Sequence, residues 1–181
     1  AGVEDNTIVM FISDQGGYFT NYPLRGGKQE GTALYEGGAK VPFIVKLPGM
    51  DKGRIVTERI STLDVFPTLV ELSGADLNAF PQLDGTSLKE VFEGAEPRMK
   101  PLYFYRSYDN QASSVIYKGY KFIYTRNGNH EMYHLDKDPN ETTNLIKDPS
   151  KKYVAWELKD MVEDFLTRYE PLSIPFPAHL K

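Results

Sequence analysis

The sequence predicts an α/β fold, in which part of a mainly parallel sheet with helices precedes a small antiparallel sheet packed with a C-terminal helix. Three observations support this class. Residues 7–13 form a continuous apolar run, which is typical of a strand buried on both faces of a parallel sheet. Residues 101–135 contain short aromatic runs in which apolar and polar side chains alternate. Residues 151–169 then show apolar side chains at helical spacing.

The first half of the chain is expected to contain two strands and two helices. The strands are residues 7–13 and 41–47, and the polar, glycine-rich residues 14–38 join them. One helix follows residues 61–64 and ends at Gly74, and a shorter helix lies around residues 87–93. Two strands are too few for a parallel sheet, which normally has several strands covered on both faces. We therefore expect the chain to begin within a larger domain.

The second half is expected to form three or four antiparallel strands. Lys118-Gly119 and Asn127-Gly128-Asn129 lie where turns are needed, and Asp138-Pro139-Asn140 ends the sheet. A helix over residues 151–169 follows, and a proline-rich tail completes the chain. Near residue 97 the pattern changes to short, aromatic-rich alternating runs, which predicts two domains, residues 1–97 and residues 98–181.

Composition narrows the class of partner. The 181 residues carry 25 acidic and 21 basic side chains, a net charge of -4, without long blocks of one sign. This balance argues against a nucleic-acid partner. No apolar run approaches the roughly 18 residues that a membrane-spanning helix needs, so no membrane partner is expected. The absence of cysteine excludes disulfides, thiolate metal sites and a cysteine nucleophile within these residues.

Asp14 and Gln15 directly follow the first predicted strand. Ligands of open α/β sheets bind beyond the carboxyl ends of the strands. A carboxylate and an amide oxygen suit calcium or magnesium better than zinc, but an aspartate that caps a turn would give the same local sequence. Lys28 follows Gly26-Gly27, two glycines that let the backbone approach a ligand closely. An oxyanion bound between a metal ion and Lys28 would offset the repulsion between their two positive charges.

Five stretches carry a family resemblance. In chain order they read DNTIVMFISDQGG, PLRGGKQEGTALYEGGAKVPFIVKLPG, STLDVFPTLVELSGA, LDGTSL and YKFIYTRNGNHEMYHLDKDPNETTNL. Their order and wording resemble the C-terminal third of type I sulfatases, arylsulfatase-like enzymes of the alkaline phosphatase superfamily. The match extends from about Asp5 to about Tyr169. The resemblance implies that residues 1–97 are the C-terminal part of the catalytic α/β domain, and that residues 98–181 are a small subdomain with an antiparallel sheet.

The resemblance also implies a mechanism, in which a formylglycine hydrate attacks the sulfur of a sulfate ester while a calcium ion holds the nucleophile and the sulfate oxygens. By position, Asp14 is implied as a calcium ligand and Lys28 as the catalytic lysine that contacts the sulfate. Gln15 occupies the neighbouring metal-ligand position, where the family usually has Asn or His.

Three further residues are candidates for substrate binding. Arg106 and Tyr108 follow the first strand of the small sheet, a region that the resemblance implies is near the cleft. Arg25 could contact an anionic substrate or pair with a nearby glutamate, Glu30 or Glu36. His130, His134 and the tyrosines at strand spacing are expected to pack in the sheet or lie on its surface, rather than bind a metal or a sugar.

One departure from the family pattern limits the expected activity. The Cys/Ser-x-Pro-x-Arg signature that yields formylglycine is absent from these residues. A missing N-terminal part would contribute it, so we expect this portion to be inactive by itself. The expected partners are a sulfated small molecule or glycan, and either the missing N-terminal part or a second copy through self-association. The family implies a periplasmic, secreted or lysosomal-type compartment.

Two alternative functions remain open. The chain could belong to a phosphodiesterase or phosphonate hydrolase of the same superfamily. It could also be a non-catalytic module whose sheet binds a glycan or another protein.

Overall fold

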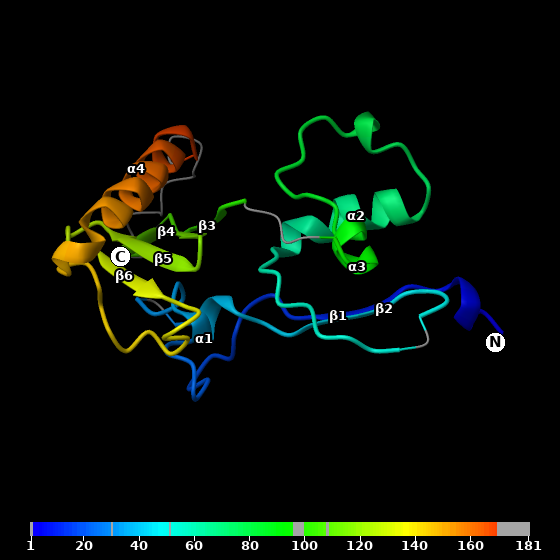
Figure 1. Cartoon of the computed structure of the whole chain (residues 1–181), viewed down its shortest axis with the longest axis horizontal. Coiled ribbons are helices and arrows are strands. Elements are labelled where there is room, and N and C mark those ends of the chain that lie inside the picture. The colour runs from blue at the N-terminus through cyan, green and yellow to red at the C-terminus, as the bar shows by residue number, and fades with distance from the viewer. Residues whose placement is uncertain (1, 30, 51, 96–99, 108, 170–181) are drawn as a thin grey trace, which may run out of the picture. The chain divides into compact units, whose positions relative to one another are not determined.

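A computed structural model describes residues 2–29, 31–50, 52–95, 100–107 and 109–169 (Figure 1). The chain forms two compact units. The first comprises Ala1–Val9 and Val45–Lys100, and the second comprises Met10–Ile44 and Pro101–Lys181. The residues that follow the first strand thus group with the C-terminal half of the sequence. The predicted domain boundary after residue 97 stays a prediction for the longer protein.

The first unit is built around a capped helix. Asp64 Oδ2 accepts a hydrogen bond from Ser61 N at 2.7 Å, and Ser61 Oγ accepts one from Leu63 N at 3.3 Å. This reciprocal cap starts the short 3-10 helix η2 and leads directly into α2, so the predicted helix is confirmed. Thr68 Oγ1 in α2 accepts from Leu88 N at 2.9 Å and so ties α2 to the segment before α3. The helices of this unit are η1 (Glu4–Asn6), η2 (Thr62–Asp64), α2 (Val65–Leu72), η3 (Leu77–Ala79) and α3 (Lys89–Glu93).

Strands β1 (Val9–Ile12) and β2 (Phe43–Lys46) pair in a two-stranded sheet. The expectation that the first strand is buried on both faces is wrong for this structure. Val9 is 54% exposed and Phe11 is 62% exposed, because no described segment covers these side chains. The larger, mainly parallel sheet stays a prediction.

The second unit contains a four-stranded antiparallel sheet, as the sequence predicts. Its strands are β3 (Leu102–Tyr105), β4 (Gln111–Tyr117), β5 (Tyr120–Thr125) and β6 (Glu131–His134), in that spatial order. Tyr117 pairs with Tyr120, and the two residues between them, Lys118 and Gly119, have φ of 50° and 78°. Positive φ at both central residues is typical of a tight hairpin turn whose twist matches that of the strands.

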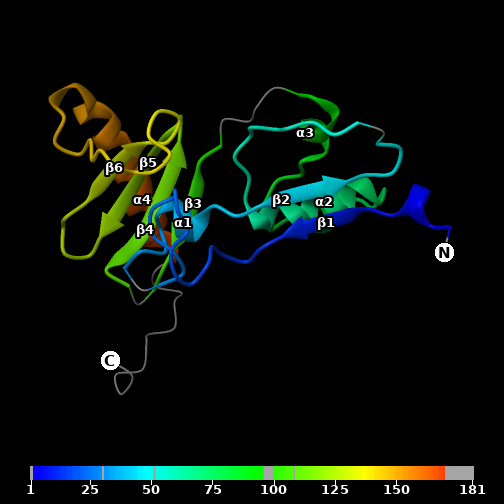
Figure 2. The same ribbon diagram turned by 90° about the horizontal axis from the view of Figure 1, so that it is seen from below.

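Each face of this sheet buries a separate apolar cluster. Val115, Phe122 and Met132 pack against α4 (Lys152–Tyr169), whose inward residues include Leu158 and Val162. The next residue along each strand points to the opposite face. There Ile116, Ile123 and Tyr133 pack with Leu34 and Tyr35. The sheet therefore lies between α4 and the segment that enters α1 (Glu36–Ala39), an arrangement that Figure 2 shows from below.

The C-terminal helix is confirmed, but the layer opposite it was not predicted. The sequence predicts that residues 14–38 connect two strands and carry candidate site residues, whereas the structure also makes Leu34 and Tyr35 core residues of the second unit. No helix within the described ranges is both long and apolar enough to cross a membrane.

Candidate functional site

The structure brings Asp14 and Lys28 into direct contact. Lys28 Nζ donates to Asp14 Oδ2 at 2.8 Å. Both side chains remain accessible, with 76% of Asp14 and 42% of Lys28 exposed. The hydrogen bond from Lys28 is the main reason that the pKa of the Asp14 carboxyl is held below its ordinary value. The pair therefore presents an ionised carboxylate and a positive charge at one accessible point.

Close backbone contacts between glycine-containing segments position this pair. Gly16 N donates to Gly38 O at 3.0 Å, Lys28 N donates to Gly17 O at 3.0 Å, and Gly37 N donates to Arg25 O at 2.7 Å. A Cβ atom on Gly16 would lie 1.8 Å from the carbonyl oxygen of Gly37, so no other residue fits without a backbone shift. The three segments can touch in this way only because glycine occupies these positions.

The Asn21 side chain binds the same segments and was not singled out from the sequence. Its Oδ1 accepts from Gly17 N at 2.8 Å, while its Nδ2 donates to Gly17 O at 2.9 Å and to Gly26 O at 3.2 Å. Asn side chains commonly bond nearby backbone in turns. The position of Asn21 between two glycine pairs was the signal that could have identified it.

The available donors suit a share of a calcium site. Asp14 and Gln15 supply one carboxylate and one amide oxygen, the hard oxygen ligands that calcium prefers. Calcium takes about six to eight oxygens, so further ligands would have to complete the shell. Within the described residues, no group of three or more His, Cys, Asp or Glu side chains could hold a metal ion. The residues therefore fit the implied ion only as part of a larger set.

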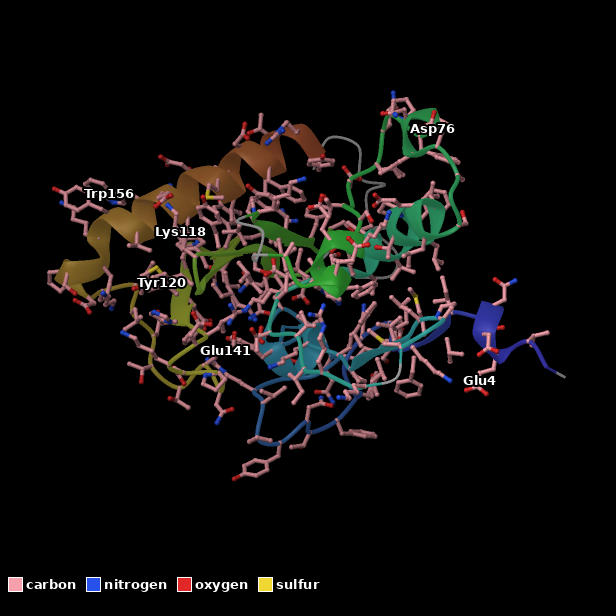
Figure 3. All side chains as sticks on the ribbon, turned by 45° about the vertical axis from the view of Figure 1, so that its right-hand side comes forward. Glu4, Asp76, Lys118, Tyr120, Glu141 and Trp156 are labelled. Carbon is pink, nitrogen blue, oxygen red and sulfur yellow. The ribbon has the colours of Figure 1, made fainter. Side chains whose placement is uncertain are left out.

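A buried charge cluster fixes the segment that carries Gly37 and Gly38 onto the sheet. Lys121 Nζ lies 2.6 Å from Glu36 Oε1 and 3.0 Å from Glu141 Oε1, and it donates to Leu34 O at 3.0 Å. Glu141 Oε2 accepts from Glu36 N at 2.6 Å, and Figure 3 labels Glu141 beside α1. Burial raises the pKa of Glu141 above its ordinary value, although Lys121 opposes the shift. The Lys121 cluster, made of Lys121, Glu36 and Glu141, is thus a buried cation shared by two acidic side chains.

The backbone of Glu141 is unusual as well. Its φ is 55°, which places a residue other than glycine in the left-handed region. Its side chain makes the contacts described above, so the fold holds this conformation together with the carboxylate.

Arg25 lies in an aromatic and acidic cluster. Its guanidinium donates to Tyr133 Oη at 2.7 Å and to Tyr35 Oη at 3.0 Å, and its Cζ lies 3.9 Å from the centre of the Tyr35 ring. Glu131 lies 3.5 Å from it and accepts a hydrogen bond from Tyr35 at 2.8 Å. Burial raises the pKa of both tyrosines, as does their hydrogen bonding to Glu131. In the described residues the acidic partner of Arg25 is Glu131, whereas Glu36 pairs with Lys121; Glu30 lies outside those residues.

Arg106 is likewise held by a neighbouring carboxylate. Its Nε donates to Asp109 Oδ2 at 3.1 Å, and Asp109 also accepts from Gly31 N at 2.9 Å through the same oxygen. Asp109 therefore connects the loop after β3 to the segment after Lys28. Tyr108, the other predicted substrate contact in this loop, lies outside the described residues.

The two histidines pack against aromatic rings, as expected. His130 stacks on Tyr124 with ring centres 4.6 Å apart, and its Nδ1 accepts from Thr125 N at 3.2 Å. His134 lies 4.4 Å from the Tyr120 ring, measured between centres.

Comparison with known proteins identifies the family. The model of the family "N-sulphoglucosamine sulphohydrolase, C-terminal" matches residues 29–168. A sulfatase of Formosa agariphila is 36% identical over 180 residues, covering 87% of this chain and 32% of the relative. The Delta 4,5-hexuronate-2-O-sulfatase of Bacteroides thetaiotaomicron is 28% identical, covering 90% of this chain and 35% of the relative.

A solved structure has the same fold as this chain. Ps i-CgsB, in complex with k-i-k-neocarrahexaose, has a TM-score of 0.80 at 24% identity, covering 97% of this chain and 40% of that protein. The chain spans about a third of the length of the sequence relatives, whose matched shares are 32% and 35%. The family model covers most of the chain, and the fold is shared with Ps i-CgsB. The chain therefore belongs to the sulfatases and corresponds to their C-terminal portion.

Proposed function

We propose that this chain is the C-terminal portion of a calcium-dependent enzyme that hydrolyses the sulfate esters of a carbohydrate. The observation that carries the proposal is the contact between Asp14 and Lys28, two residues 14 positions apart that meet at 2.8 Å on a rigid glycine scaffold. A carboxylate that can bind a metal, beside a cation that can bind an oxyanion, matches the requirements of sulfate ester chemistry.

The roles follow from the charge of each group. Asp14 and Gln15 would hold the calcium ion, which when bound acts as a Lewis acid on the sulfate oxygens. In such a complex, Lys28 donates hydrogen bonds to an oxygen of the sulfate group and offsets its charge. The present contact with Asp14 keeps the ammonium within reach of that position. Lys28 is therefore the catalytic residue that this portion contributes, and the nucleophile comes from elsewhere in the longer protein.

The substrate class is supported by the relatives. One of them is named for a hexuronate sulfate, and a structural relative contains a bound neocarrahexaose. A sulfated sugar is therefore the substrate that we propose for the longer protein. Arg25, Arg106 and Tyr108 remain candidates for contacting it, although the described contacts of Arg25 and Arg106 are with protein groups.

The test compares variants of the full-length protein on an aryl sulfate and on a sulfated disaccharide. We expect Lys28→Ala to lower kcat/KM by about 100-fold or more, because one fixed donor to a developing charge is worth about that much. Asp14→Asn should act in the same direction, and added calcium should partly restore its activity. Lys118→Ala is the matched control. Lys118 is not part of this site, and its Nζ lies 3.0 Å from Glu157 Oε1.

Two results would count against the proposal. Full activity of Lys28→Ala would remove the assigned role of the lysine. A strong preference for aryl phosphate over aryl sulfate would favour a phosphodiesterase or phosphonate hydrolase instead. The 181 residues by themselves should hydrolyse neither substrate.

A further inference from the structure

A pocket of about 320 Å³ lies beside the start of α4. Its volume is at the lower end of the range that is typical of ligand sites in proteins. Its wall combines aromatic and cationic side chains: Phe122, His130, Lys147, Lys152, Trp156 and Lys159. Phe122 belongs to the apolar cluster under α4, whereas the segment that carries the Asp14 and Lys28 pair packs on the other face of the sheet through Leu34 and Tyr35. The pocket is therefore separate from the candidate sulfate site.

Phe122 is buried in the wall of this pocket, whereas the Trp156 ring is exposed. Trp156 is 51% exposed, and Figure 3 shows it projecting outward from α4. The exposed ring of Tyr153 meets it edge to face, with centres 5.7 Å apart. Lys152 Nζ lies 4.3 Å from the centre of the Trp156 ring. The Lys152 ammonium thus lies over the Trp156 indole as a cation–π pair.

The charge of the wall is positive. Lys147 and Lys152 have no acidic partner among the residues that the structure describes, whereas Lys159 shares its charge with Glu163 at 2.8 Å. The one acidic residue of the wall is Asp148, whose Oδ1 accepts a hydrogen bond from Ser150 N at 2.9 Å.

His130 adds a hydrogen-bond donor to the wall. Its Nδ1 accepts from Thr125 N at 3.2 Å, so in the neutral ring the proton is on Nε2. The pocket therefore combines an exposed indole, an imidazole and two lysines that form no ion pair among the described residues.

We propose that this pocket is a second, non-catalytic binding site for an anionic sugar residue. The apolar face of a pyranose ring would pack on the Trp156 indole, while a sulfate or carboxylate group on that ring would bind Lys147 and Lys152. Neither feature alone selects such a ligand: an inorganic anion gains no stacking on the indole, and a neutral sugar gains no charge attraction from the lysines. A site of this kind holds one part of a glycan chain while another part of the chain is free to enter a different site.

Trp156 provides a direct probe, because it is the only tryptophan of the 181 residues. We would titrate this chain with a sulfated chondroitin disaccharide and follow the intrinsic fluorescence of Trp156. Inorganic sulfate and a neutral disaccharide at the same ionic strength are the comparison ligands. We expect a saturable change with the sulfated disaccharide and none with inorganic sulfate. The unsulfated chondroitin disaccharide, which keeps its carboxylate, separates the two possible anionic groups.

Variants then test the assigned contacts. Lys147→Gln and Lys152→Gln should each weaken binding by about tenfold, the effect typical of losing a hydrogen bond to a charged group. Trp156→Ala should abolish binding of the sulfated disaccharide, which calorimetry can measure in this variant. Lys118→Gln is the control, because Lys118 does not line the pocket and pairs with Glu157.

Three outcomes overturn the inference: no saturable response to either chondroitin disaccharide, an equal response to inorganic sulfate, or unchanged affinity in both pocket lysine variants. The inference stands apart from the proposed function. Lys28→Ala should leave disaccharide binding at Trp156 unchanged, and the pocket variants should leave hydrolysis of a small aryl sulfate by the full-length protein unchanged.

Discussion

Lys121 shows how a single side chain joins sequence stretches that lie far apart. Its ammonium contacts acidic residues 85 and 20 positions away, Glu36 and Glu141, and no part of its side chain is exposed. A buried cation is tolerated only where carboxylates and hydrogen bonds replace the lost water. Two stretches that carry the family resemblance therefore meet at one charge cluster. Glu36 comes from the stretch with YEGG, and Lys121 and Glu141 come from the stretch that runs from YKFIY to DPNETTNL. No local pattern in the sequence indicated this pairing.

Replacing Lys121 tests how much the Lys121 cluster contributes to the free energy of unfolding. Lys121→Met would leave Glu36 and Glu141 buried together without a cation, so we expect a loss of about 3–5 kcal/mol in the free energy of unfolding. Urea denaturation followed by circular dichroism measures it. Lys118→Met, at a surface ion pair with Glu157, should cost no more than about 1 kcal/mol. Equal losses in the two variants would show that burial of Lys121 has no special importance.

His130 predicts a dependence of stability on acidity. Burial lowers the pKa of His130 in the folded state below its ordinary value of 6.5. The folded state then binds fewer protons than the unfolded state, so the contribution of His130 is present above pH 6.5 and is lost as the pH falls through the folded pKa. Protonation also removes the acceptor for Thr125 N. Thermal unfolding between pH 5 and 7.5 should show a smaller acid loss in His130→Gln than in the parent chain.

At the scale of elements, the sequence predicts those helices and turns that depend on residues close together in the chain. The hairpin at Lys118 and Gly119 and the helix α4 follow from turn residues and helical spacing, and both are confirmed. The layer formed by Leu34 and Tyr35 could not be predicted in this way, because its packing depends on contacts with strands about 80–100 residues later. The contact between Asp14 and Lys28 lies between these cases: the residues were identified, but the glycine contacts that join them became visible only in the structure.

The glycine scaffold gives a prediction for the site. In Gly16→Ala, the new methyl group would meet the carbonyl oxygen of Gly37, so the backbone must move and stability should fall by at least about 1 kcal/mol. As Lys28 moves away, the pKa of the Asp14 carboxyl should rise toward its ordinary value, which NMR titration can measure. Gly53→Ala is the control, because a Cβ there meets nothing within 4 Å. An unchanged Asp14 titration in Gly16→Ala would mean that the scaffold does not position the pair.

At the scale of the whole molecule, the two sheets differ in how well they bury apolar side chains. The antiparallel sheet is covered on both faces, whereas β1 leaves Val9 and Phe11 exposed. Relatives for which this chain matches about a third of the length have much more sequence that could cover such a strand. The proposed calcium site is incomplete in the same way, since Asp14 and Gln15 would supply only some of the ligands that the ion requires.

The exposed strand predicts self-association of this chain. Apolar side chains along a short strand favour pairing with another copy, so sedimentation analysis should show a concentration-dependent rise in mass. Phe11→Lys should reduce it, because a charge on an exposed strand disfavours such pairing. Tyr22→Lys is the control, since Tyr22 is exposed but lies outside the strands. A purely monomeric parent chain, or an equal effect of both variants, would contradict this explanation.

Glu141 combines an unfavourable main-chain conformation with side-chain contacts that only a carboxylate can make. Its main chain adopts a conformation that glycine accepts freely and that costs other residues about 1–2 kcal/mol. Glycine, however, would remove the carboxylate that holds Lys121 and the start of α1. No residue therefore meets both requirements at this position without a cost, and the loss of a counter-charge in the interior would cost more than the strained main chain.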